Sequence, residues 1–201
     1  MKLFLWAAGG ALALLLVALG GWTLLMRTVE TPDHRVIRAE GAYELRAYPA
    51  LRVAEIARDG PRRAALREGF GPLARYIFAR DREGPKIAMT APVTQRPSGE
   101  GWAVAFILPA EYADAAPPAP ATPGVAIRTE PAGRWAALRF SETPDDASLA
   151  AREAALRGWI AAQELSAQGA AVYAYYDDPM VPGFLRRNEV LIRVAGPETP
   201  A

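Results

Sequence analysis

The residues that could carry out acid–base or nucleophilic chemistry are few and poorly placed for it. His34 is the single histidine, and no GxSxG motif surrounds any serine, so a Ser-His-acid arrangement is not indicated. The acid pair Asp145-Asp146 fits a helix start and the pair Asp177-Asp178 fits a turn. No GxxxxGK or GxGxxG phosphate-binding loop is present. The sequence therefore predicts a protein that is not an enzyme.

Composition excludes several classes of cofactor and partner. The chain of 201 residues has no cysteine, which rules out disulfides, iron–sulfur clusters and thiolate ligation of haem. With one histidine, multi-histidine metal sites are also excluded, and no structural metal is predicted. A formal net charge of +1 gives no basic footprint for nucleic acid.

What remains is an apolar binding site. Phe70 and Leu73 lie on one predicted helix stripe, and a large flat ligand favours such walls. Further apolar residues come from KIAMTAPV and from DDPMVPGFLRRNE, namely Met89, Met180, Val181 and Phe184. Arginines could hold ligand carboxylates at the rim through bidentate hydrogen bonds, and the candidates are Arg62, Arg63, Arg186 and Arg187. The alternative is that the stripe is core and the arginines are solvated.

The N-terminus has the pattern of a membrane segment. Residues Leu3 to Met26 contain no charge, and these 24 residues exceed the roughly 20 that cross a hydrocarbon core. We predict a membrane anchor in residues 1–27, with a cleaved secretory signal as the alternative, followed by a tether over residues 28–41. The resemblance to an export signal favours the exported side of the membrane, although counting the flanking basic residues favours the opposite orientation.

The elements after the tether alternate between strands and helices. Residues 43–48 and 51–58 read as a hairpin around Pro49-Ala50. A helix follows, with Leu66, Phe70, Leu73 and Ile77 on one face, but Gly69, Gly71 and Pro72 predict two helical pieces or a bend.

A strict alternation marks the next strand. Trp102, Val104, Phe106 and Leu108 share one face, and Ala103, Ala105 and Ile107 share the other. A proline-rich connector at 109–124 then leads to a second set of elements in the same order: strands at 125–130 and 134–141, a helix at 146–168, and strands at 171–176 and 189–194. We predict an α+β fold with two ββαββ-like halves, whose antiparallel sheet closes into a distorted β-barrel and carries two packed helices.

Five segments together resemble the SOUL haem-binding protein family. In order, they are AYELRAYPALRVAEI, RRAALREGFGPLARYI, KIAMTAPVT, the PPAP connector and YYDDPMVPGFLRRNEVLIRV. The resemblance spans about Ala42 to Val194, within a single predicted domain at 42–196 that is followed by a tail at 197–201. It implies the same barrel with two helices, and binding of haem or another porphyrin in a shallow apolar groove against the first helix.

The resemblance also suggests the ligand-binding residues. The family's groove helix matches residues 63–77, and Met180 with its neighbours would close the groove from the loop. The candidates are Arg63, Leu66, Phe70, Leu73, Met89, Met180 and Phe184. Some relatives carry a histidine, proposed as axial iron ligand, where this chain has Ala47, and lysines credited with ligand contact correspond to Val181 and Pro72.

The expected function is reversible, non-catalytic tetrapyrrole binding at the membrane, in transport, buffering or sensing. An interaction module for a protein or lipid partner on the same fold is the first alternative. A tetrapyrrole-processing enzyme is the second, with Tyr43, Tyr48, Tyr175 or Glu189 as candidate acid–base groups.

Overall fold

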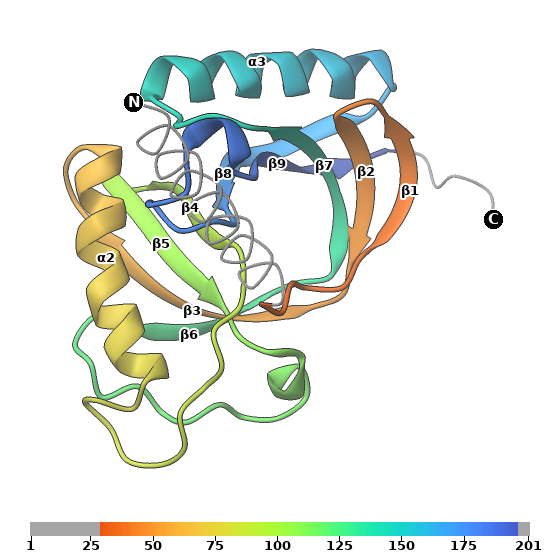
Figure 1. Cartoon of the computed structure of the whole chain (residues 1–201). Helices are drawn as coiled ribbons and strands as arrows, with labels where there is room; N and C mark the ends of the chain where they lie inside the picture. Colours follow the sequence, from red (N-terminus) through yellow and green to blue (C-terminus); the bar gives the residue numbers. More distant parts are fainter. Residues whose placement is uncertain (1–28, 197–201) are drawn as a thin grey trace, which may run out of the picture.

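The computed structural model describes residues 29–196, which form one nine-stranded antiparallel sheet and two α-helices, an α+β fold (Figure 1). The elements are β1 Arg35–Glu40, β2 Tyr43–Tyr48, β3 Leu51–Arg58, α2 Arg62–Ile77, β4 Val93–Ser98, β5 Gly101–Ile107, η1 Ala110–Tyr112, β6 Ala126–Glu130, β7 Gly133–Phe140, α3 Asp146–Ala162, β8 Ser166–Tyr175, η2 Gly183–Leu185 and β9 Asn188–Ala195. The predicted anchor at 1–27 and the tail at 197–201 lie outside the described residues. Within 29–196, no helix is long and apolar enough to span a membrane.

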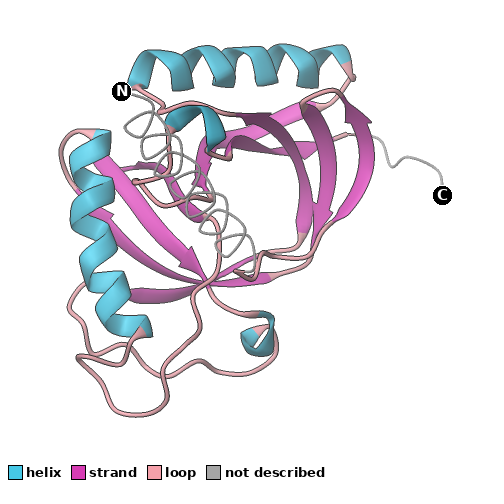
Figure 2. Ribbon diagram, viewed as in Figure 1, coloured by secondary structure: helices cyan, strands magenta, loops and turns pink. Residues whose placement is uncertain are grey.

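The predicted repeat of elements is present. Elements β2 to β5 with α2 form one ββαββ half, and β6 to β9 with α3 form the other. The strand order is β1-β2-β7-β9-β8-β4-β5-β3-β6. The two edge strands, β1 and β6, do not pair with each other in the described part of the chain, so the predicted closure into a barrel is wrong. The sheet is instead open and curled, with both helices on its outer side (Figure 2).

The predicted hairpin between β2 and β3 is also wrong. Across Pro49-Ala50 the chain continues in the same direction, and so does the chain across Pro131-Ala132. Tyr48 faces Gly133 in the pair β2·β7, and Leu51 faces Glu130 in the pair β3·β6, so one register runs through both breaks. A two-residue hairpin turn needs positive φ angles, and neither Pro49 nor Ala50 has one. The result is two long paired strands that join the halves.

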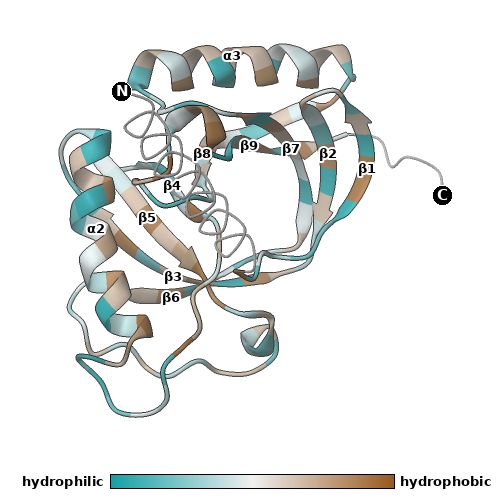
Figure 3. Cartoon of the chain, in the orientation of Figure 1, coloured by the Kyte–Doolittle hydropathy of each residue, from teal (hydrophilic) through white to brown (hydrophobic). Residues whose placement is uncertain are grey.

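Each helix covers its own core cluster. Leu73, Tyr76 and Ile77 of α2 pack on Ile56 of β3 and Val104 of β5. Under α3, the cluster joins Leu149, Leu156 and Ile160 to the outer faces of the second half's strands. The alternation predicted for β5 is confirmed, because Val104 and Phe106 lie under α2 whereas Ala105 and Ile107 belong to a separate cluster on the other face. Along both helices, hydrophilic and hydrophobic residues alternate, as expected of helices with one buried side (Figure 3).

Both helices differ from the sequence prediction. Helix α2 is not divided into two pieces, although Pro72 lies inside it. The carbonyl that this proline leaves without a donor belongs to Glu68, which is exposed, so water can satisfy it. Helix α3 ends at Ala162, and β8 already begins at Ser166, because Glu164 adopts a positive φ of 58° and reverses the chain.

A buried ion-pair network lies on the inner face of the sheet. Arg46 of β2 donates from Nη1 and Nη2 to the two carboxylate oxygens of Glu189 of β9, at 2.8 and 2.7 Å, and from Nε to Glu44 at 2.7 Å. All three residues are less than a tenth exposed. Tyr176 donates its hydroxyl proton to Glu189 at 2.7 Å. The guanidinium therefore neutralises two largely buried carboxylates.

We predict that Arg46→Leu lowers the free energy of unfolding by about 3–5 kcal/mol, because it leaves buried carboxylates without their partner. Urea unfolding followed by circular dichroism measures the loss. The control is Arg157→Leu, which breaks the half-exposed pair of Arg157 with Glu153 on α3 and should cost less than about 1 kcal/mol. Equal losses in the two variants would contradict the account of the network.

Candidate functional site

An exposed apolar strip runs along the flank of α2. The Phe70 side chain is 41% exposed and packs edge-on against the Phe106 ring, with the ring centroids 5.2 Å apart. Met89 is 44% exposed and, together with Phe106 and Ile77, lines a small cavity beside the helix. The three side chains Phe70, Phe106 and Met89 are called the α2 strip below. They bring together two of the residues that the sequence predicted for a ligand.

The segment that holds Met89 is irregular and tightly anchored. The strand that follows it, β4, begins only at Val93. Ile87 is buried and donates its backbone N–H to the Ile77 carbonyl at 2.8 Å. Thr90 donates its hydroxyl to the Ile107 carbonyl, and the Ala91 N–H donates to Glu30 at 2.8 Å. The segment KIAMTAPV is thus fixed on both sides of Met89, which leaves that side chain at the surface.

The second half contributes an apolar loop at 177–187. Met180 is 85% exposed and Phe184 is 75% exposed, while Val181 is buried. The carboxylates of Asp177 and Asp178 accept backbone N–H groups within the loop, which confirms that this acid pair belongs to a turn. Large apolar side chains that are exposed at a loop tip bury little surface and so contribute little to the stability of the fold. They are therefore candidates for contact with a ligand or partner.

The other predicted ligand contacts are less accessible. Leu66 is half-buried against the core, and Leu73 is fully buried there, so in this structure Leu73 cannot touch a ligand. The periodicity of the stripe could not separate its buried members from its exposed ones, because Leu66 and Leu73 face the sheet and Phe70 lies at the edge of that face.

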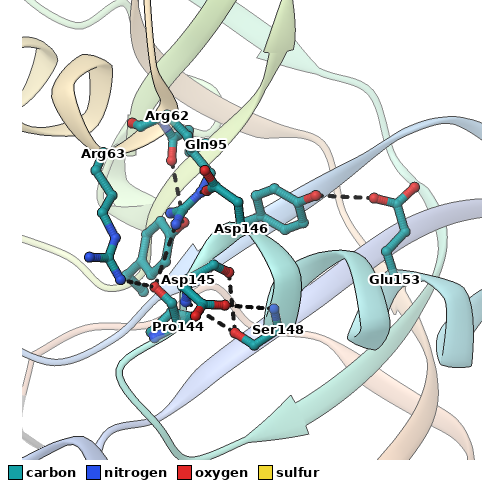
Figure 4. Close-up of polar contacts among 10 residues, drawn as sticks. Arg62, Arg63, Gln95, Pro144, Asp145, Asp146, Ser148 and Glu153 are labelled. Atoms are coloured by element: carbon teal, nitrogen blue, oxygen red, sulfur yellow. Dashed lines mark hydrogen bonds and ion pairs between the residues drawn. The ribbon is translucent and has the colours of Figure 1, made fainter.

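The predicted rim arginines make contacts within the protein. The Arg62 side chain is 4% exposed; its Nε lies 2.6 Å from Asp146 Oδ1, and its Nη1 donates to the Tyr175 hydroxyl at 2.9 Å (Figure 4). Arg63 donates to the Pro144 carbonyl at 2.9 Å. Arg186 donates to the Val181 carbonyl at 2.7 Å. Arg62 thus ties the start of α2 to the start of α3.

The acid pair Asp145-Asp146 lies at the start of α3, as predicted, and Asp145 forms a capping box there with Ser148. Asp145 accepts the Ser148 N–H at 2.7 Å, and the Ser148 hydroxyl accepts the Asp145 N–H at 3.1 Å (Figure 4). The hydrogen bond from the Ser148 backbone holds the pKa of Asp145 below its ordinary value. Nearby, burial raises the pKa of Tyr175. This junction is structural, and it holds α2 and α3 in fixed relative positions.

The comparisons with known proteins identify the family. A family model described as SOUL heme-binding protein matches residues 29–193. The chain is also 30% identical over 179 residues to "Heme-binding protein 1" of Mus musculus, an alignment that covers 83% of this chain and 93% of that protein. The chain belongs to the SOUL heme-binding protein family.

Solved structures show the same fold at low sequence identity. The EcmrR C-terminal domain is 13% identical with a TM-score of 0.59, and the match covers 76% of this chain and 96% of that one. A hydrolase from Listeria innocua is 10% identical with a TM-score of 0.55, with coverage of 79% and 94%. These likenesses extend to the fold alone.

Within 29–196, no group of three or more His, Cys, Asp or Glu residues is placed to hold a metal ion. Ala47, at the position where some SOUL relatives carry a histidine, pairs with Arg35 of β1. The neighbouring His34 ring lies against the Tyr48 ring at 4.9 Å between centroids and a tilt of 35°, a proximity that sequence reasoning missed because it placed His34 in the tether.

Gly69 sets the position of the α2 strip. A Cβ at this residue would lie 2.9 Å from two side-chain atoms of Val104 on β5, so α2 approaches the sheet as closely as glycine allows. The next residue is Phe70, whose contact with Phe106 depends on this approach.

We predict that Gly69→Ala lowers the free energy of unfolding by about 1–3 kcal/mol through overpacking, although alanine favours helix. The matched control is Gly158→Ala in α3, where an added Cβ meets open space and should stabilise by about 0.5–1 kcal/mol. Denaturant melts of both variants give the two values. Stabilisation by Gly69→Ala would show that α2 is not held by this contact.

Proposed function

We propose that the chain binds haem or a related tetrapyrrole reversibly on the α2 strip, without chemistry of its own. The observation that carries the proposal is the exposure of Phe70 and Met89, which both border the buried Phe106 ring. Flat macrocycles gain free energy from stacking on aromatic and thioether side chains. Membership of the SOUL family, and the name of the mouse relative, support a tetrapyrrole as the ligand.

The helix offers cations beside the strip. Arg63 and Arg67 precede Phe70 by seven and three residues and therefore share its face of α2, and both are exposed. Their guanidinium groups can reach out to propionate groups at the edge of a macrocycle, although Arg63 would share its donors with the Pro144 carbonyl. From the other half, Met180 and Phe184 are proposed to cover the outer face of the ligand.

We further propose that the binding depends on the macrocycle more than on the iron. Ala47 offers no ligand atom, and the one atom of the α2 strip that can ligate iron is the Met89 sulfur, whereas both phenylalanine rings can contact only the macrocycle. A role in transport, buffering or sensing follows from reversible binding without turnover. Anchoring through residues 1–27, with the domain on the exported side of the membrane, is part of this proposal and rests on the sequence of that segment.

The test is a titration of the full chain in lipid nanodiscs with haemin and, separately, with iron-free protoporphyrin IX. Absorbance of the porphyrin and tryptophan quenching report binding, and empty nanodiscs give the background. We predict saturable one-to-one binding of both porphyrins, with dissociation constants within about tenfold of each other. Phe70→Glu should weaken the binding of each porphyrin by at least about tenfold, because the new carboxylate would have to be buried against the porphyrin ring system.

Ala155→Glu is the control, since it places the same charge on the exposed side of α3. Circular dichroism checks that both variants fold. Binding that is indifferent to Phe70→Glu would sink the assignment of the site. The absence of saturable binding of either porphyrin would also contradict the assignment of a tetrapyrrole as the ligand, and would favour the alternative of a protein or lipid partner.

A further inference from the structure

The inner face of the sheet has two apolar clusters that do not merge. One consists of Val53, Ala105 and Ile107, with Leu51 packed against it. The other lies in the second half and comprises Ala137, Ala174 and Leu191, flanked by Tyr48, Trp135, Val172 and Tyr176. Residues of both clusters line the same cavity. Two apolar walls that face a shared space can take up an apolar body between them.

A larger cavity adjoins this one. The two share Pro32, Tyr48 and Tyr176, and the larger has a volume of about 560 Å³. That volume lies within the roughly 300–1,000 Å³ that small-molecule sites span. The apolar walls thus lead into a polar chamber that is large enough for an organic ligand.

The carboxylates of the polar chamber are already neutralised. Both oxygens of Glu189 accept from Arg46, and Glu44 accepts from Arg46 and pairs with Arg139 at 2.8 Å. Arg187 also lines the chamber, which gives three arginines against two glutamates. A cationic ligand would therefore have to break existing ion pairs, whereas an anionic one would not.

The hydrogen-bonding capacity that remains in the chamber is on donors. The Tyr48 hydroxyl accepts from Arg46 Nη1 at 3.0 Å, and its own proton has no acceptor among residues 29–196. Burial raises the pKa of Tyr48 against the lowering effect of Arg46, so the phenol keeps that proton. Buried Nε of Arg187 makes no hydrogen bond within the described chain, although Asp177 lies 3.5 Å away. The unused Tyr48 donor in a lined cavity favours a ligand that brings an acceptor, and the Arg187 guanidinium, paired with Asp177, adds positive charge beside it.

We propose that the inner cavity is a second binding site, separate from the α2 strip, for an amphipathic organic monocarboxylate. Its carboxylate accepts from the Tyr48 hydroxyl and Arg187, and its apolar body lies between Ile107 and Leu191. The neighbouring Trp135 ring completes the apolar wall. The site lies on the face of the sheet opposite to α2, so a tetrapyrrole on the α2 strip would not occupy it.

Photolabelling of the full chain in nanodiscs tests the site. The probe is a diazirine-bearing benzoate, and the matched control is the neutral benzyl alcohol with the same diazirine. Mass spectrometry maps the labelled residues. The expected result is saturable labelling of the strands around Trp135 and Leu191 by the acid, with at least about fivefold less labelling by the alcohol.

Two variants remove the proposed donors while each keeps most of the side chain's bulk: Tyr48→Phe and Arg187→Met. Each should raise the half-saturating concentration of the acid about fivefold to tenfold, as expected for the loss of one charge-assisted hydrogen bond. Phe70→Glu should leave the labelling unchanged while it weakens porphyrin binding, which separates this site from the proposed function.

Equal labelling by acid and alcohol would overturn the proposal, and so would labelling confined to α2. It would also be overturned if neither donor variant, shown to be folded by its melting temperature, altered the half-saturating concentration. Loss of the labelling on saturation with haemin would show one shared site and would contradict the separation proposed here.

Discussion

The pairing of two long strands, each interrupted by a proline, is the constraint on which the rest of the structure depends. The strand β2–β3 passes Pro49, the strand β6–β7 passes Pro131, and one antiparallel register continues across both interruptions. Each long strand therefore belongs to both halves. On its other edge, β2–β3 carries β1 and then β5, so the sheet must curl to place all its strands.

The curl produces two faces with different chemistry. On the outer face, α2 and α3 bury most of the large apolar side chains, and the junction of Arg62 with Asp146 fixes one helix start beside the other. On the inner face, no helix of the described chain covers the sheet, and Arg46 with its two glutamates lies beside two small apolar clusters. The α2 strip lies at the border of the outer core, where the close approach at Gly69 leaves Phe70 only partly covered.

Local patterns in the sequence were sufficient for most of the elements, although β1 lies in the segment predicted as a tether. Strict alternation gave the two faces of β5, and the acid pair Asp145-Asp146 gave the start of α3. Pairing partners were not accessible in this way. Pro49-Ala50 looks like a turn because proline is common in turns, but only the distant partners β6 and β7 show that the chain runs straight on.

The same distinction holds for the candidate sites. Phe70 and Met89 were predicted and lie together, whereas Leu73 was predicted on the same periodicity and is core. The inner cavity was missed altogether, because Tyr48, Trp135 and Leu191 are brought together by strand pairing over long sequence separations and share no local motif. Thr90 is similar: its role is a hydrogen bond to the Ile107 carbonyl, which nothing in KIAMTAPV reveals.

Hydrogen–deuterium exchange of the full chain, with and without saturating protoporphyrin IX, tests the central claim most directly, because it reports where the macrocycle lies without relying on any variant. The account predicts slower exchange of backbone amides in α2, in residues 87–91 and in the loop at 177–187, with β7 and β9 unchanged. Protection confined to the inner strands, or no protection at α2, would contradict it.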